Sequence, residues 1–410
     1  MFQFASLPPL SLYIHLPWCV KKCPYCDFNS HTLKEKGTDS LPEDRYIDAL
    51  MADLEHDLPR VWGRPVQSLF FGGGTPSLFS PAAIDRLLAA VRARLPLRPD
   101  AEITLEANPG TVELERFQGY RAAGVNRLSI GIQSFNAGHL RELGRIHGRD
   151  EALRAASAAR AAGFDNFNLD LMFGLPNQTV DEARADLQCA LDLKPTHLSL
   201  YQLTIEPNTL FHAHPPSLPD DDRVWEIQSV LQAMTAAAGF QHYEISAYAR
   251  DSLRARHNLN YWRFGDYLGI GAGAHAKITD ANGITRLWKI KQPAEYMNKA
   301  GTSAAIGGEQ RLTRADAAFE FMLNVLRLSD GFEPALFQER TAQSLSLVEP
   351  ALQQAETLGL MTRGHDRIQP TEKGLRFLND LLCLFLPETN VHDDPAHLEK
   401  NHPLAADRRG

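Results

Sequence analysis

The stretch Tyr13-Ile-His-Leu-Pro-Trp-Cys-Val-Lys-Lys-Cys-Pro-Tyr-Cys-Asp-Phe28 is the feature around which the rest of the chain can be interpreted. It follows an apolar run, Leu10 to Leu16, that predicts a buried strand. Three cysteines then stand in a C-x3-C-x2-C array at Cys19, Cys23 and Cys26. Thiolates are the usual ligands of iron–sulfur clusters, and a [4Fe–4S] cluster normally takes four of them. Three thiolates would leave one iron open, as a catalytic metal site requires.

Two other uses of these thiols remain open at this stage. A structural zinc site needs a fourth ligand, which His15 or His31 can supply. A disulfide with one spare thiol is the second alternative. The chain has only five cysteines, which is not a disulfide framework and fits a reducing compartment. The remaining two, Cys189 and Cys383, lie in apolar-periodic stretches and are interpreted as small buried hydrophobic residues.

Length and charge limit the class of protein. The chain has 410 residues, of which 44% are hydrophobic, and a formal net charge of −8. This length predicts a large α/β barrel and a smaller additional domain. No apolar run is long enough for a membrane span, and the N-terminal Met-Phe-Gln-Phe has no signal-peptide pattern, so we expect a cytoplasmic protein. The acidic balance gives no support to nucleic-acid binding.

An alternation of strand and helix patterns runs from Leu10 to the end of the sixth strand. The strand patterns are Leu10–His15, Ser68–Phe71, Ile103–Leu105, Arg127–Gly131, Phe167–Met172 and His197–Tyr201. The helix patterns are Glu43–Leu58, Ala82–Arg94, Leu114–Ala123, Asp150–Ala162, Thr179–Leu193 and Arg223–Ala238. This order predicts parallel strands with helices outside, in a partial (β/α)6-type barrel. An open doubly wound sheet is the competing topology.

Polar and glycine-rich residues follow most of these strands, where a barrel gathers its chemistry. They are Gly72-Gly-Gly-Thr-Pro76, Glu106, Gln133 and Asp170. Glycines allow close approach of the backbone to a ligand, and carboxylates can accept hydrogen bonds from an amine or ribose hydroxyls. Arg145 can pair with a carboxylate. Together these groups suit a zwitterionic amino-acid nucleoside.

The cysteine array, placed after a strand and a Pro-aromatic dipeptide, resembles the signature of the radical S-adenosylmethionine (SAM) superfamily. The resemblance implies that SAM chelates the open iron and that the reduced cluster cleaves it to a 5′-deoxyadenosyl radical. The ordered motifs resemble the branch that contains oxygen-independent coproporphyrinogen III oxidase and its haem-chaperone paralogue, over nearly the whole chain. These motifs are Y-x-H-x-P-x-C-x3-C-x2-C, GGGTP, E-x-N-P, G-x-Q-S-F, the Arg145 position and D-L-x-x-G-L-P.

The resemblance implies roles for individual residues. Cys19, Cys23 and Cys26 would ligate the cluster, and Tyr25 would pack near the adenine of SAM. The remaining SAM contacts would come from Tyr13, Gly73, Gly74, Thr75, Glu106, Gln133, Arg145 and Asp170.

Two features favour the chaperone over the oxidase. The oxidase pattern carries a fourth cysteine two residues after the third, where this chain has Phe28. His257-Asn-Leu-Asn-Tyr-Trp262 resembles the H-N-x-x-Y-W motif of the haem-chaperone group and makes His257 the candidate haem ligand. A hydrogen-bonded histidine at a domain junction is the alternative interpretation, and His212 and His214 are rival ligands.

The sequence therefore predicts a SAM- and cluster-binding haem chaperone that delivers haem to acceptor haemoproteins. The alternative is an oxidase that decarboxylates coproporphyrinogen III propionates, and whether the chain is an enzyme stays open because Phe28 replaces the fourth cysteine. Radical modification of RNA is disfavoured because no second cluster motif and no basic appended domain are present. Homodimer formation and transient membrane visits are compatible with the sequence, which has no membrane anchor.

The C-terminal part differs in pattern from the barrel. After a Gly/Ala-rich connector, Gly301–Gly308, helix patterns surround a short hairpin near Gly364. This order predicts a small, winged-helix-like domain, residues 309–386, after a barrel with its extension, residues 1–300. Eight Lys and Arg against ten Asp and Glu between Arg311 and Leu386 argue against a DNA-binding wing and favour a lid. Residues 387–410 are expected to be disordered.

Overall fold

A twelve-stranded sheet forms the body of the protein, whose computed structural model describes residues 2–33, 41–111, 114–250 and 253–387. All six predicted strands are present and parallel to one another: β1 (Leu10–Leu16), β4 (Val66–Gly73), β5 (Leu97–Ala107), β6 (Arg127–Gln133), β7 (Phe167–Phe173) and β8 (His197–Gln202). They lie side by side in chain order, without the reversal that defines a doubly wound sheet. Because β8 pairs with β10 (Ala247–Ala249) and not with β1, the barrel is partial, as predicted.

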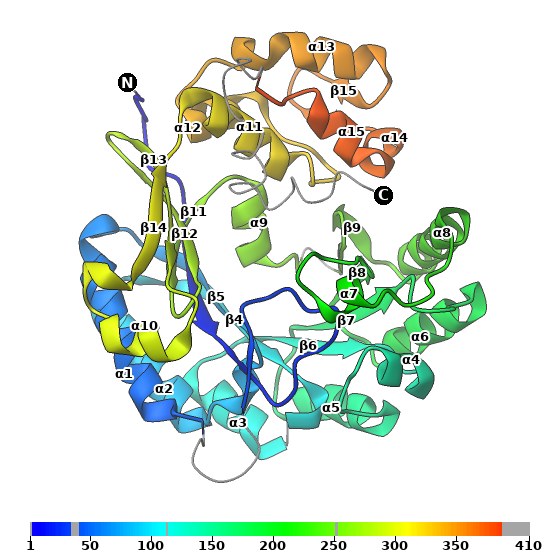
Figure 1. The fold of residues 1–410 in the computed structure, drawn as a ribbon. Helices are drawn as coiled ribbons and strands as arrows, with labels where there is room; N and C mark the ends of the chain where they lie inside the picture. The colour runs from blue at the N-terminus through cyan, green and yellow to red at the C-terminus, as the bar shows by residue number, and fades with distance from the viewer. Residues whose placement is uncertain (1, 34–40, 112–113, 251–252, 388–410) are drawn as a thin grey trace.

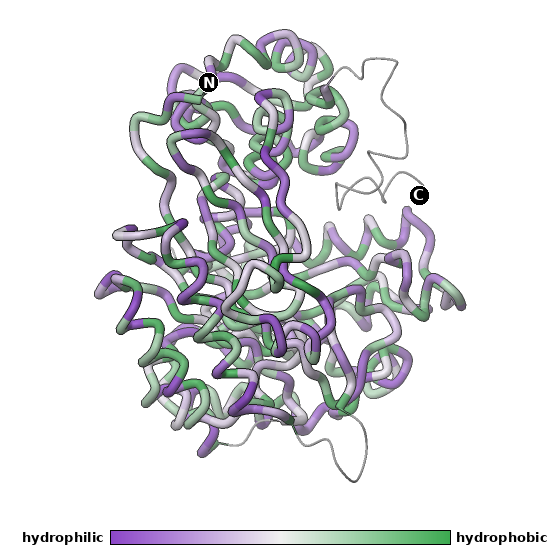
Figure 2. Tube along the Cα trace, turned by 60° about the vertical axis from the view of Figure 1, so that its left-hand side comes forward, coloured by the Kyte–Doolittle hydropathy of each residue, from purple (hydrophilic) through white to green (hydrophobic). Residues whose placement is uncertain are grey.

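Six long helices cover the outer face of this curved sheet (Figure 1). They are α1 (Glu43–Asp57), α2 (Pro81–Arg94), α3 (Leu114–Ala123), α5 (Arg149–Ala161), α6 (Val180–Asp192) and α8 (Asp221–Ala237). Polar and apolar residues alternate along these helices, as an outer layer with one buried side requires (Figure 2). Thr179 caps α6 in a capping box with Glu182, and Ser80 caps α2 ahead of a proline. The helix positions predicted from sequence are confirmed to within two residues at each end.

Shorter elements join the strands and helices of the barrel. A two-stranded parallel pair, β2 (Trp18–Cys19) and β3 (His31–Thr32), flanks the cysteine loop. The others are η1 (Leu58–Arg60), η2 (Pro76–Leu78), η3 (Pro109–Thr111), α4 (Ala137–Glu142) and α7 (Leu210–Ala213). These short pieces occupy the connections at the ends of the strands, where the candidate site lies.

Both edges of the sheet are extended by strands that the sequence pattern does not predict. Beside β1 lie β11 (Asp266–Ile270), β12 (His275–Asp280), β13 (Gly283–Lys289) and β14 (Ile306–Arg311), and beyond β10 lies β9 (Gln241–Glu244). Strand β11 is parallel to β1, and β12 to β14 are antiparallel to their neighbours. The predicted connector Gly301–Gly308 is therefore partly wrong, because its end belongs to β14. Helix α10 (Pro293–Lys299) and η4 (Ser303–Ala305) link β13 to β14.

The C-terminal helices and hairpin pack around a second apolar cluster that includes Phe321, Phe332 and Phe337. Their bounds are α11 (Arg314–Val325), α12 (Pro334–Thr341), η5 (Leu345–Val348), α13 (Glu349–Thr357), β15 (Met361–Arg363), β16 (Ile368–Pro370), α14 (Glu372–Arg376) and α15 (Leu378–Cys383). The helix pattern that follows the hairpin forms two short helices, α14 and α15, in place of one continuous helix. Helix α9 (Arg256–Trp262) lies between this part and the barrel (Figure 1). The predicted disordered tail falls almost entirely outside the described residues.

Candidate functional site

The cysteine loop is closed at its base by backbone hydrogen bonds. Strands β2 and β3 pair Trp18 with His31, and the His31 N–H donates to the carbonyl of Pro17 at 2.7 Å. The N–H of Leu33 donates to the carbonyl of Cys19 at 2.9 Å. The two ends of the loop, residues 17–19 and 31–33, therefore lie side by side just after β1. All three of its cysteines are free thiols and half-buried.

A polar side chain lies beside each thiol. Thr75 Oγ1 donates to Cys19 Sγ at 3.5 Å, Arg145 Nη1 lies 3.7 Å from Cys23 Sγ, and Ser30 Oγ lies 3.7 Å from Cys26 Sγ. Burial raises the pKa of the Cys19 and Cys26 thiols. A bound cation or cluster would reverse that preference, since a metal deprotonates its thiol ligands outright.

A clamp of hydrogen bonds, centred on Asn29, holds the end of the loop. Its carbonyl faces His15 Nε2 at 2.9 Å, and His15 Nδ1 lies 2.9 Å from the hydroxyl of Tyr13. The Asn29 side-chain amide donates to the carbonyls of Ala272 and Lys291 at 2.8 and 2.9 Å. The clamp thus connects the cysteine loop to β1 on one side and to the chain around β12 and β13 on the other.

Three glycines make this clamp sterically possible. A Cβ on Gly73, whose φ is +114°, would lie 2.6 Å from the imidazole of His15. A Cβ on Gly273 (φ +79°) would lie 2.4 Å from Asn29 Nδ2, and one on Gly271 (φ +108°) would lie 2.5 Å from the His15 carbonyl. The neighbouring Gly74 is similarly confined by the carbonyl of Trp18 at 2.5 Å. These glycines are therefore required by the packing of the chain itself, apart from any ligand.

The zinc alternative has little support in this geometry. Both ring nitrogens of His15 face protein partners, and His31 Nε2 lies 3.2 Å from Asn29 Oδ1. Within the described residues, no three side chains from His, Cys, Asp and Glu are grouped tightly enough to hold a metal ion.

Inside the barrel, two carboxylates lie close enough to affect each other. Burial, and secondarily the charge of Asp170, raise the pKa of Glu106 to about 8, while the Gly73 N–H acts in the opposite direction. Asp170 accepts hydrogen bonds from Asn168 Nδ2 at 2.6 Å and from Ser129 Oγ at 3.1 Å. Burial raises the pKa of Tyr13 strongly, and the charge of Glu106 adds to that effect. This region can bind an amine or hydroxyl donor.

At the same strand ends, Arg145 and Gln133 each have a buried polar atom without a hydrogen-bond partner among the described residues. Arg145 Nη2 donates to the carbonyl of Gly131 at 2.7 Å and to Asn108 Oδ1 at 3.0 Å. Although burial acts against it, the neighbouring Tyr25 and Cys23 raise the pKa of the guanidinium. Arg145 Nε and Gln133 Oε1 are buried without a hydrogen-bond partner among the described residues. Gln133 also holds a left-handed backbone, φ +67°, which is strained for a non-glycine residue and typical of functional sites.

Two residues of the site are not among those predicted from the sequence. Tyr201, at the end of β8, is partly buried and forms a hydrogen bond with Asp170. Asn108 is a partner of Arg145, and its place in the E-x-N-P motif was the available signal. Tyr25, predicted to lie near an adenine, is half-buried with its ring centroid 6.4 Å from that of Phe211. Its apolar neighbours are Leu143, Met172, Leu175 and Leu203.

The candidate haem ligand His257 is enclosed in this structure. Its side chain lies in α9 and the residue is 2% exposed. The ring stacks on Phe70 at 4.8 Å, Nδ1 lies 3.4 Å from Ser68 Oγ, and Nε2 has no partner among the described residues. Burial, and to a lesser degree Arg127, lower the pKa of His257 to about 3. Haem iron cannot reach this ring unless α9 moves, whereas His212 and His214 are exposed.

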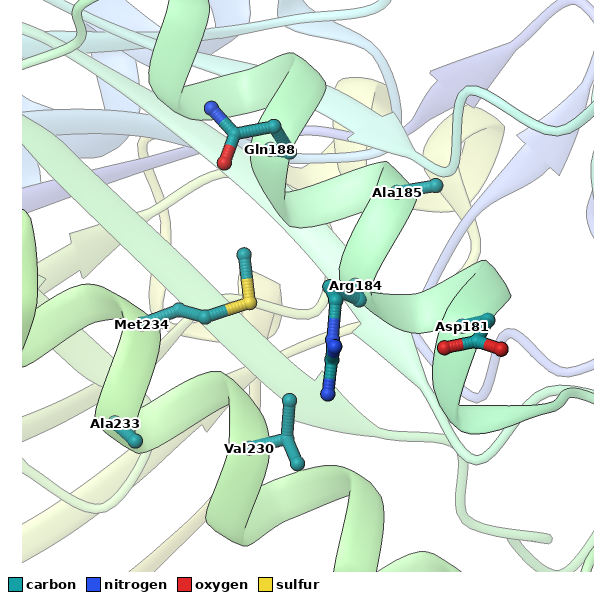
Figure 3. A pocket seen from close by; sticks show the side chains of 7 residues that line it. All are labelled: Asp181, Arg184, Ala185, Gln188, Val230, Ala233 and Met234. Atoms are coloured by element: carbon teal, nitrogen blue, oxygen red, sulfur yellow. The ribbon is translucent and has the colours of Figure 1, made fainter.

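A groove on the outer surface is separate from these residues. It lies between α6 and α8 and is lined by Arg184, Val230 and Met234 among others (Figure 3). Both helices belong to the outer layer, so the sheet separates this groove from the strand ends that carry Glu106 and Asp170. Among the helices of the described chain, none combines the length and the hydropathy that a bilayer crossing requires.

Comparison with known proteins agrees with this arrangement. Residues 13–190 match the radical SAM superfamily, and residues 312–377 match the HemN C-terminal domain. The heme chaperone HemW of Escherichia coli is 52% identical over 384 residues, which are 93% of this chain and 100% of that protein. HemW of Haemophilus influenzae is 49% identical over 388 residues, with 93% and 99% coverage.

A solved structure shows the same fold over nearly the whole chain. The coproporphyrinogen III oxidase HemN of Escherichia coli, described as a radical SAM enzyme, superimposes with a TM-score of 0.78 at 27% identity. The match covers 92% of this chain and 90% of HemN. Identity to HemW is about twice as high as identity to HemN, over a similar share of the chain. The chain therefore belongs to the HemW family of radical SAM proteins.

Proposed function

We propose that this protein is a haem chaperone that binds a [4Fe–4S] cluster and SAM and delivers haem to acceptor haemoproteins. The observation that carries the proposal is Phe28, which stands where the oxidase pattern has a fourth cysteine and is 64% exposed at the end of the cysteine loop. An exposed phenyl group cannot ligate metal or transfer protons. The names of the similar proteins from E. coli and H. influenzae support the same choice.

The donor set of the strand ends fits the proposed cofactors. Cys19, Cys23 and Cys26 would hold the cluster, and the guanidinium of Arg145 near Cys23 would stabilise a thiolate electrostatically. When bound and reduced, the cluster supplies the electron that cleaves SAM. Glu106 and Asp170 would accept hydrogen bonds from SAM, and at neutral pH the raised pKa of Glu106 keeps much of that group protonated.

Other residues would orient SAM. Arg145 Nε and Gln133 Oε1 are available to a ligand, and we assign them to the carboxylate and to a donor group of SAM, respectively. Tyr25, with its apolar neighbours, would contact the adenine. Tyr13, Gly73, Gly74 and Thr75 would complete the contacts from β1 and the end of β4. The tyrosine and threonine also support His15 and Cys19 directly.

The remaining parts of the proposal concern partners and location. We place the protein in the cytoplasm, where its five cysteines stay reduced. The C-terminal helices lie over the barrel next to α9, and we propose that they act as a lid or docking domain for an acceptor (Figure 1). We also propose that the protein can form a homodimer and that binding of the cluster influences this dimerisation.

An oxidase is the second candidate, because the solved structure of HemN matches almost the whole chain. One anaerobic experiment separates the two. Reconstituted protein is incubated with reductant, SAM and coproporphyrinogen III, and a parallel sample is loaded with haem and mixed with an apo-haemoprotein. We expect haem binding and transfer without protoporphyrinogen formation. Protoporphyrinogen formed together with 5′-deoxyadenosine would identify an oxidase and contradict the chaperone function.

A further inference from the structure

Asp186 is a buried carboxylate on the apolar face of an outer helix. The buried face of α6 consists of Ala183, Leu187 and Ala190, and Asp186 lies among them, 5% exposed. A polar side chain at such a position costs free energy unless its oxygens accept hydrogen bonds. The groups that Asp186 contacts therefore explain why a carboxylate is present there.

Both oxygens of Asp186 accept hydrogen bonds from the turn that follows β6. The Ser134 hydroxyl donates to Oδ2 at 2.5 Å, and the Phe135 N–H donates to Oδ1 at 2.7 Å. Burial raises the pKa of Asp186, and these two hydrogen bonds oppose that rise more strongly than the charges of His139 and Arg149 do. The main partner of this carboxylate is therefore the turn, and not a neighbouring cation.

The Ser134 hydroxyl is held from both sides. Its oxygen accepts a hydrogen bond from the Asn136 N–H at 2.9 Å, and its hydrogen is directed at Asp186. Asn136 in turn caps α4, where its side chain accepts from the Gly138 N–H at 2.8 Å. Asp186 thus fixes a turn whose other end is anchored at the start of a helix.

The residue directly before this turn is Gln133, whose backbone is strained. Its φ is +67°, and the register between β6 and β7 shifts between Gly131 and Gln133. Such a conformation of a non-glycine residue persists only where the surrounding structure holds it. The two residues that follow Gln133 are the ones that donate to Asp186, so the carboxylate holds the strained backbone from its C-terminal side.

The backbone held in this way directs the Gln133 amide to the proposed SAM site. A Cβ on Gly131 would lie 3.0 Å from Gln133 Nε2 and 3.4 Å from Arg145 Nη2, so both side chains lie against the same glycine. The Oε1 atom of Gln133 is buried and has no hydrogen-bond partner in the described part of the chain. A shift of the turn would therefore move an acceptor that is available to a ligand.

We propose that Asp186 is a positioning residue for SAM, which holds the turn after β6 so that the Gln133 amide faces the ligand. The inference rests on the proposed binding of SAM and assigns a role to a residue that does not contact it. Asp186 lies on α6, outside the sheet, whereas Gln133 presents its amide at the strand ends. The outer helix layer thereby contributes to the geometry of the site.

Anaerobic calorimetric titration of the oxidised, cluster-reconstituted, full-length protein with SAM tests the inference. Asp186→Asn keeps the size of the side chain but offers one acceptor oxygen in place of two. We expect it to weaken SAM binding by about tenfold while the iron content stays unchanged. Ser134→Ala removes one of the two hydrogen bonds and should weaken binding several-fold. Asp192→Asn, an exposed position on the same helix, is the matched control and should bind SAM like the wild type.

The Gln133→Ala background separates positioning from a general effect on the fold. If Asp186 acts through Gln133, Asp186→Asn should weaken binding by less than about twofold in that background. If Asp186→Asn does not take up the cluster, Ser134→Ala provides the same comparison. Wild-type affinity of Asp186→Asn, or an equal loss in both backgrounds, would overturn the positioning role and leave the proposed function in place. Absence of SAM binding by the cluster-loaded wild type would overturn the proposed function itself.

Discussion

The two ends of the inner face of the sheet differ in whether their polar side chains are hydrogen-bonded inside the protein or exposed to solvent. At the parallel end, β1 and β4 to β8, residues such as Asn168, His197 and Tyr13 are hydrogen-bonded to other side chains inside the barrel. At the antiparallel end, β11 to β14, the side chain of His275 is exposed. A preorganised, closed region suits a resident cofactor.

The outer side of the antiparallel end is not open, however. Lys289, 0% exposed, donates to Asp53 and Asp57, each at 2.6 Å. Asp53 also accepts hydrogen bonds from the Tyr296 hydroxyl at 2.6 Å and from the Gly271 N–H at 3.2 Å. This buried network fixes the turn that carries the Asn29 clamp. The network therefore forms a closed, hydrogen-bonded base under the antiparallel end.

Breaking that base should produce the largest loss of stability. Lys289→Met would leave two buried carboxylates without a cation, and we expect the free energy of unfolding to fall by about 3–5 kcal/mol. The control is Lys299→Met, which removes the exposed pair with Glu295 and should cost less than about 0.5 kcal/mol. Urea denaturation measures both. Equal effects would show that the buried network does not stabilise the antiparallel end.

The parallel end should instead respond to pH. The native pKa of Glu106 is about 8 against an ordinary value of 4.5, so the native state retains a proton that the unfolded chain loses between these values. The free energy of unfolding therefore falls as pH rises through that window. Each pH unit corresponds to about 1.4 kcal/mol, so the free energy of unfolding of the wild type should fall by about 3 kcal/mol between pH 5 and 7.5 because of this residue. Glu106→Gln should not show this decrease.

The matched control for Glu106→Gln is Glu115→Gln, an exposed residue on α3. It should leave the pH dependence of the urea midpoint unchanged. A wild-type pH profile in Glu106→Gln would mean that Glu106 titrates normally and that the carboxylate pair is more solvated than its burial indicates.

A smaller effect is expected where the chain crowds His15. Gly73→Ala combines a positive φ with a contact of 2.6 Å to the imidazole, and we expect a loss of about 2–3 kcal/mol. Gly239→Ala has a positive φ of 82° but no atom within 4 Å of its Cβ, so it should cost only about 1 kcal/mol. The difference between the two melting temperatures isolates the clash with His15. Equal melting temperatures of the two variants would show that the His15 imidazole moves aside without cost.

Asn29 connects the two ends, and its loss should be the mildest of these changes. Asn29→Ala removes two side-chain hydrogen bonds to carbonyls of the chain near β12 and β13, worth about 1–2 kcal/mol together. We also expect faster hydrogen exchange at residues 19–31 and faster loss of cluster absorbance in the presence of a chelator. Asn298→Ala, which loses an exposed hydrogen bond with Arg45, is the control. Unchanged exchange in the loop would contradict the clamp.

The sequence predicted the parallel end far better than the antiparallel one. Strands such as Phe167–Phe173 are nearly continuous apolar runs, as expected for strands buried on both faces. In β12 and β13 the buried positions include Lys277 and Lys289, whose carboxylate partners lie on other elements. The order of residues in the sequence does not show such ion pairs, so these strands are too polar to be predicted as buried. Likewise, the enclosure of His257 depends on where α9 packs, which its motif does not encode.

The central claim is that the cysteine loop and the strand ends form one site for a cluster and SAM. Anaerobic reconstitution with iron and sulfide, followed by electron paramagnetic resonance of the reduced protein with and without SAM, tests it most directly. We predict about four iron atoms per chain and a cluster signal that changes when SAM is added. Cys23→Ser should abolish that signal, and Cys189→Ser should not. Binding of a single zinc ion, or a cluster signal unaffected by SAM, would contradict the account.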